Sequence, residues 1–358
     1  MAADPRRFPG LLFIHSTLIV LCLALGCTAA AIRWFDGRVQ AVDMPLDARA
    51  VAGAAPEATL GPLSAPPSPP ISLDADLARN GYTLPEHADV YAVRVLEGPE
   101  GRVYQQYQAG GGALAADFWP ASSIKVLAAL GALSFARFLG YSGAATVTFD
   151  DGGESRTIRS IYEPAIRDSS NYDYDLLVRI AGLDWLNSVF LTAANGFPAT
   201  SITRSYAGTE LSSSPAMILE EGDQRTYVPA RTARLAPECK AGNCSNLFEM
   251  AESVRRIVLS DQLPNEQRFD LDQADLKDLA ESLHQAEGFF GPAVASVLGD
   301  GARIYSKPGD AADRDCLDVA LIESAQRKRY LLAATVPHRE GGCDALVDLA
   351  TQVLKLLV

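Results

Sequence analysis

The segment FWPASSIK, residues 118–125, places a serine and a lysine at the expected start of a helix. Ser122 and Lys125 are three positions apart, so on a helix they share one face about one turn apart. A lysine can take a proton from a hydroxyl only when it is neutral, and burial or a second cation lowers its pKa toward that state. The segment therefore predicts a nucleophilic Ser122 with Lys125 beside it. A helix that starts with a capping serine and a solvated lysine has the same spacing, so this segment does not decide the function alone.

Two further segments carry polar groups that suit such a site. The first, IRDSSN at 166–171, ends in Ser169, Ser170 and Asn171, and its structural alternative is a Ser/Asn-rich connection between helices. The second, RIYSKPGD at 303–310, contains Lys307 and stands directly before the last expected hairpin. The chain has only six lysines, which makes two lysines in such segments less expected by chance.

The order S-x-x-K, S-x-N and K-x-G resembles the motifs of the penicillin-recognising serine acyltransferases, the class A β-lactamases and their relatives. The resemblance covers roughly residues 82–358. It implies an α+β fold in which an antiparallel sheet, built from both chain ends, holds an inserted helical lobe. It also implies that Ser122 forms an acyl-enzyme.

The resemblance assigns a role to each remaining motif residue. Ser169 would relay a proton between the lysine and the leaving group, and Asn171 would bind the substrate amide and the lysine. Lys307 would add positive charge to the cleft. Gly309 would let substrate approach the backbone, and the N–H of Asp310, with that of Ser122, would face the developing oxyanion.

Two departures weaken the expectation of an efficient β-lactamase. Pro308 replaces the threonine or serine that helps to hold the substrate carboxylate in the family, and a proline here predicts an edge or bent strand. The family's E-x-x-x-N pattern, whose glutamate activates the deacylating water, is absent. Glu210 and Glu220 are the candidates for this role, and the alternative is that both lie on solvated loops.

Hydrophobic patterns support the same architecture. Strands are expected at 90–96 and 103–107 near the start of the domain, and at 317–322 and 330–336 near its end. Helices are expected mainly between these pairs, at 124–138, 174–181, 247–259 and 276–285, and a final helix carries apolar residues from Leu346 to Leu357. We assign 82–126 and 297–358 to the sheet part and 127–296 to the helical part of one domain, 73–358.

The N-terminal region has the pattern of a membrane anchor. An apolar run at 11–32 is long enough to cross a bilayer, and a tail, 1–10, with two arginines precedes it, so we expect a single-pass protein of the bacterial inner membrane with its domain outside the cytoplasm. A lipoprotein signal ending at Cys27 and a cleaved signal are the alternatives. The segment 33–72, rich in alanine and proline, is expected to be a linker.

Cysteine usage agrees with export to an oxidising compartment. Four cysteines follow the apolar run, and they allow three pairings. We favour Cys239 with Cys244 and Cys316 with Cys343. A zinc site is the rival for the first pair.

Composition and motif searches exclude several functions. A formal net charge of −13 without a local basic cluster argues against nucleic acid as a partner. No histidine neighbours a GxSxG or HExxH motif, which makes a Ser-His-Asp triad and a zinc protease improbable. We expect no cofactor and no metal.

Two functions remain. The leading hypothesis is an exported, membrane-tethered serine hydrolase that acts on an amide or ester, with a β-lactam or a cell-wall peptide as candidate substrates. The alternative is a catalytically impaired binding or scaffolding module of the cell envelope. The sequence leaves the oligomeric state open.

Overall fold

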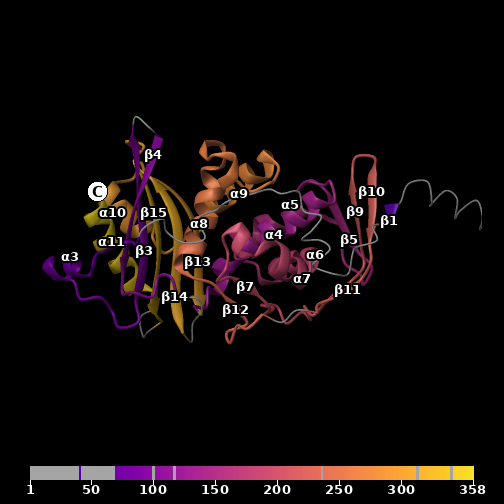
Figure 1. Cartoon of the computed structure of the whole chain (residues 1–358), viewed down its shortest axis with the longest axis horizontal. Helices are drawn as coiled ribbons and strands as arrows, with labels where there is room; N and C mark the ends of the chain where they lie inside the picture. The colour runs from indigo at the N-terminus through magenta and orange to yellow at the C-terminus, as the bar shows by residue number, and fades with distance from the viewer. Residues whose placement is uncertain are drawn as a thin grey trace, which may run out of the picture.

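A six-stranded sheet forms one half of the domain (Figure 1). The computed structural model describes residues 40–41, 69–98, 101–115, 118–234, 237–311, 314–338 and 342–358. All neighbouring strands are antiparallel except β2 and β4. In spatial order, the strands are β13 (Arg303–Ala311), β14 (Asp315–Glu323), β15 (Arg329–Pro337), β3 (Asp89–Gly98), β4 (Gly101–Ala109) and β2 (Ile71–Ser72). The predicted sheet built from both chain ends is confirmed.

Helices cover both faces of this sheet, so consecutive residues of its central strands are all buried, on one face or the other. On the outer face lie α3 (Asp74–Arg79), α10 (Gly291–Leu298) and α11 (Asp344–Leu357), which pack on outward side chains such as Val90 and Leu332. On the inner face α8 (Leu247–Val258) packs against β3, β14 and β15. The expected division of the chain at residue 297 falls inside α10, which packs against α11 on the sheet side.

The helical lobe is built around α4 (Lys125–Phe138), which follows a 3₁₀ turn, η1 (Ala121–Ile124). Most of α4 is buried, because it lies at the centre of the lobe and contacts three other helices. The other regular helices of the lobe are α5 (Ile158–Arg167), α6 (Asn171–Ala181), α7 (Leu183–Trp185) and α9 (Gln273–Gln285). Short turns are η2 (Leu186–Phe190), η3 (Ala193–Asn195), η4 (Ser260–Gln262) and η5 (Asn265–Gln267).

A second sheet at the far end of the helical lobe was not predicted. Its order is β1 (Gln40–Ala41), β10 (Gln224–Val228), β9 (Met217–Glu221), β5 (Thr146–Phe149) and β6 (Arg156–Thr157). The β9–β10 turn contains Gly222 with φ +59°, a conformation that glycine adopts without steric cost. Two short ladders pair β7 (Ser201–Ile202) with β12 (Asn243–Cys244), and β8 (Ser213–Ser214) with β11 (Arg231–Thr232).

Both favoured disulfides are present. Cys239 bonds Cys244 with their Cα atoms 5.9 Å apart, and Cys316 bonds Cys343 with their Cα atoms 5.6 Å apart. The second bond ties the start of α11 to β14. The rival zinc site at Cys239 and Cys244 is wrong, because both sulfurs are in the disulfide.

The expected tail at 1–10, anchor at 11–32, lipoprotein cysteine and most of the linker lie outside the described residues. Within the described part of the chain, one stretch, Ala121–Phe138, has the length and apolar composition of a membrane span, and 78% of it is buried inside the protein. Such burial is typical of a core helix in a globular domain.

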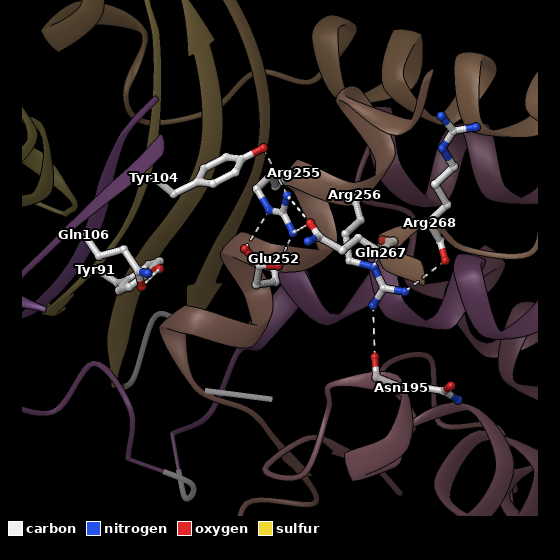
Figure 2. Close-up of polar contacts among 9 residues, drawn as sticks. All are labelled: Tyr91, Tyr104, Gln106, Asn195, Glu252, Arg255, Arg256, Gln267 and Arg268. Carbon is white, nitrogen blue, oxygen red and sulfur yellow. Dashed lines mark hydrogen bonds and ion pairs between the residues drawn. The ribbon is translucent and has the colours of Figure 1, made fainter. Parts of the chain in front are cut away.

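Buried arginines on α8 connect the sheet to the helical lobe (Figure 2). The Arg255 guanidinium forms a buried ion pair with Glu252, and its Nη1 lies 3.4 Å from the Tyr104 hydroxyl on β4. Arg256 has no described carboxylate partner. It donates to the backbone carbonyls of Gln267 and Asn195, both at 2.9 Å, and its guanidinium carbon lies 3.8 Å from the Phe269 ring centroid.

We predict that Arg256→Met lowers the free energy of unfolding by about 2–4 kcal/mol, because two buried carbonyls lose their donors. Urea denaturation measures this loss. Arg137→Met is the matched control, since Arg137 is 53% exposed and its ion pair is long, and it should change stability by less than about 0.5 kcal/mol. Equal stability of the two variants would contradict a clamping role for Arg256.

Candidate active site

Ser122 lies where the edge strand of the main sheet meets the start of the central helix. The preceding residue, Ala121, has φ +44°, a strained conformation for a residue with a Cβ atom. A Cβ atom at Gly309 of β13 would stand 2.8 Å from the Pro120 carbonyl oxygen. Gly309 is thus needed because β13 packs closely on the turn that carries Ser122. This reason for a glycine adds to the one expected from the sequence, which was the approach of substrate to the backbone.

Lys125 is fully buried and lies at the centre of a polar cluster. Its Nζ is 3.0 Å from Ser122 Oγ, 3.1 Å from Ser169 Oγ and 2.7 Å from Asn171 Oδ1, and it also donates to the Ser169 carbonyl. Three of the predicted residues thus converge on the lysine. The helical spacing accounts for Ser122, and the tertiary fold supplies the rest.

Ser169 is positioned by the turn that enters α6. Its φ is +56°, and the next residue, Ser170, caps the helix by accepting the Asp173 N–H. Lys307 reaches Ser169 from the sheet side, with Nζ 2.9 Å from Ser169 Oγ. The Ser169 hydroxyl therefore stands between two amines, one from each part of the domain.

Burial lowers the pKa of Lys125 to about 7, and the positive charge of Lys307 contributes, while Asp175 opposes the shift. Burial also lowers the pKa of Lys307 to about 8, against the opposing charge of Asp318. An ordinary lysine has a pKa near 10.4 and is almost wholly protonated at neutral pH. Here a large fraction of Lys125 is neutral at pH 7, so its amine can accept the Ser122 proton.

Asp175 and Tyr206 support the cluster and were missed in the sequence. Asp175, 1% exposed, accepts hydrogen bonds from Ser205 Oγ and the backbone N–H groups of Tyr206 and Ala207. Tyr206 donates its hydroxyl to the Ala121 carbonyl at 2.7 Å, and its ring lies under the Lys125 amine. The signal for Asp175 was its place four residues after Asn171, on the same helix face.

Asp310 and Pro308 lie on β13, the edge strand of the sheet, which confirms the expectation drawn from the proline. The Asp310 carboxylate is half exposed, 3.7 Å from His338 Nε2. Asp310, His338, Cys316 and Cys343 form a group of metal-ligand types, but the two sulfurs are joined to each other. With both sulfurs in a disulfide, these four residues do not fit a metal ion.

The described contacts of Glu210 and Glu220, the two candidates for activating the deacylating water, do not include the Lys125 cluster. Glu210 is exposed and accepts the Ser212 N–H. Glu220 belongs to β9 in the second sheet, with its carboxylate 3.4 Å from Arg225 Nε.

The fold is similar to that of class A β-lactamases. A variant of PBP-A, solved as an acyl-enzyme complex with penicillin G, matches with a TM-score of 0.54 and 16% identity, over 81% of this chain and 98% of that one. The TLA-3 extended-spectrum β-lactamase matches with a TM-score of 0.54 and 14% identity, over 80% of this chain and 98% of that one. The chromosome-encoded β-lactamase of Vibrio parahaemolyticus matches with a TM-score of 0.52 and 16% identity, over 79% of this chain and 96% of that one. At these identities the likeness is one of fold.

No protein-family model matches the sequence, and no curated protein matches it significantly.

We predict that Lys307→Gln raises the pKa of Lys125, because a positive neighbour is removed. Phosphonylation of Ser122 by a fluorophosphonate should speed up as pH rises through about 7 in the wild type, where Lys125 loses its proton. In the variant the rising limb should move to higher pH. Rates measured from pH 5 to 10 test this, and an unmoved midpoint would exclude electrostatic coupling of the two lysines.

Proposed function

We propose that this protein is a serine hydrolase or transpeptidase-like enzyme that forms an acyl-enzyme at Ser122 with an amide or ester substrate. One observation carries the proposal: a buried amine with a lowered pKa stands 3.0 Å from the serine hydroxyl. This is the arrangement that an activated serine requires.

In the proposed reaction, neutral Lys125 takes the proton from Ser122 Oγ as this oxygen attacks the substrate carbonyl. The backbone N–H groups of Ser122 and Asp310 bind the oxyanion of the tetrahedral intermediate. When the intermediate collapses, the C–N or C–O bond breaks and the leaving group takes a proton. Ser169, within hydrogen-bond distance of Lys125 and Lys307, delivers that proton.

The candidate substrates are a β-lactam or a cell-wall peptide. The similarity to PBP-A, whose variant was captured with penicillin G, supports this class. The proposed location supports it too: an anchor at 11–32 and a linker would place the domain in the periplasm or outside the cell, where such substrates occur. Both disulfides agree with an oxidising compartment.

Release of the acyl group is proposed to be slow. The Asp175 carboxylate is engaged with backbone N–H groups and Ser205, and Glu210 and Glu220 make their described contacts elsewhere. The described contacts of these three carboxylates therefore do not place any of them to activate a water molecule at the ester.

We predict that fluorescent penicillin labels the wild type at Ser122 and that the label persists for many minutes after excess reagent is removed. Intact-mass spectrometry follows the adduct, and Ser122→Ala is the control that should remain unlabelled. Rapid hydrolysis without a detectable adduct would contradict slow release. If folded wild type reacts with neither penicillin nor a fluorophosphonate, the proposed enzyme is excluded.

A binding or scaffolding module of the cell envelope is the second candidate, and Pro308 is the observation that favours it. The proline stands where the family carries a hydroxyl for the substrate carboxylate, so it weakens the expected recognition of penicillins.

We predict that Pro308→Thr increases the second-order rate of acylation by penicillin about tenfold or more, because a hydroxyl bonded to a charged group contributes about 1.5–3 kcal/mol. Reaction with an uncharged fluorophosphonate is the control, since it has no carboxylate to bind, and should change little. Stopped-flow or gel-based labelling measures both rates. A parallel increase with both reagents would show that the substitution changes the nucleophile rather than carboxylate recognition.

A further inference from the structure

A cavity lies away from the serine cluster, at the end of the main sheet where β3 meets the β14–β15 turn. Its volume is about 240 Å³, and its lining consists of residues 94–97 and 326–330. Lys307 lies on β13, which β14 separates from β15, so the cavity is distinct from the candidate active site.

The lining carries four cations and one carboxylate in a protein whose net charge is −13. The carboxylate, Glu97, is already used, because it lies 2.8 Å from Arg102 Nε and 3.6 Å from Arg329 Nη1. Arg329 is also paired with Glu323 at 2.7 Å. The remaining three cations, Arg94, Arg327 and Lys328, have no carboxylate partner among the described residues. Positive charge is therefore in excess in the cavity.

Tyr330 forms a closed part of this lining. The residue is fully buried, yet its hydroxyl has no hydrogen-bond partner in the described part of the chain. Tyr330 pairs with Arg94 across β15 and β3, so both side chains stand on the same face of the sheet. Solvent does not reach this hydroxyl, so the cations of the lining are the groups that can contact a ligand in the cavity.

The turn that carries the other two cations is well held. The Ser324 N–H donates to the Lys328 carbonyl at 2.8 Å, and Ser324 Oγ accepts the Lys328 N–H at 3.1 Å. Arg327 has φ +62°, a conformation that costs about 1–2 kcal/mol for a residue other than glycine. Both cations are exposed, so the turn presents them to solvent beside the cavity.

We propose that this cavity binds a small anion of the phosphate class, held by Arg94, Arg327 and Lys328. Guanidinium groups bind phosphate oxygens through charge-assisted hydrogen bonds. The cavity is smaller than the roughly 300–1,000 Å³ of pockets for drug-sized ligands, so the ligand is inorganic phosphate or a short phosphate ester.

Calorimetric titration of the full chain, in an uncharged detergent, with inorganic phosphate and with glycerol phosphate tests the proposal. The second probe is the soluble counterpart of a phospholipid headgroup, and tighter binding of it would identify an ester rather than free phosphate as the ligand. At about five times the dissociation constant, the unfolding midpoint should rise by about 2–4 °C. Sodium chloride at equal ionic strength should give no such rise.

Three variants make the test specific. Arg94→Gln and Lys328→Gln should each weaken phosphate binding about tenfold or more, and Lys277→Gln, which removes an exposed lysine on α9, should leave it unchanged. Failure of both probes to bind, or equal binding by wild type and Arg94→Gln, would overturn the proposal.

Discussion

The site depends on keeping one amine, that of Lys125, out of water while surrounding it with groups that do not neutralise it by charge. Its immediate partners are hydroxyl, amide and carbonyl oxygens, and the nearest strong charge besides Asp175 is a second amine. Desolvation and repulsion therefore act in the same direction on its pKa. A carboxylate in direct contact would restore the charged form and remove the base. The burial of α4 and the covering of both sheet faces are what make this environment possible.

Two parts of the chain must meet for the cluster to exist. The helical lobe contributes Ser122, Lys125 and Ser169, and the edge strand β13 contributes Lys307. Close packing at Gly309 fixes the strand against the serine turn, while α8 links β4 to the helical lobe through its buried arginines. Strain is concentrated at the contact, since Ala121 and Ser169 both have positive φ. The rigid surroundings therefore hold the reacting groups in conformations that an isolated peptide would avoid.

Much of this arrangement was predictable because its signals are local. The apolar runs of β3 and β15, the helical period of α11 and the three polar motifs are all patterns within short segments. The second sheet was missed because β9 and β10 have only five residues each, and Glu220, Glu221 and Arg225 interrupt their apolar pattern. The place of Asp175 four residues after Asn171 was a local signal, but it did not reveal the hydrogen-bond partners of Asp175, which lie some 30 residues away at Ser205 to Ala207. The proposed anion cavity was not predicted for the same reason, because it joins the end of β3 to a turn far along the chain.

The most direct test of the account is the protonation of the lysines themselves. The chain has six lysines, few enough for selective isotope labelling and nuclear magnetic resonance titration, with Lys125→Gln and Lys307→Gln providing the assignments. We expect two depressed apparent pKa values, about 7 for Lys125 and about 8 for Lys307. A pKa near the ordinary value of about 10.4 for Lys125 would contradict this expectation, because Lys125 would then be charged at neutral pH and unable to activate Ser122.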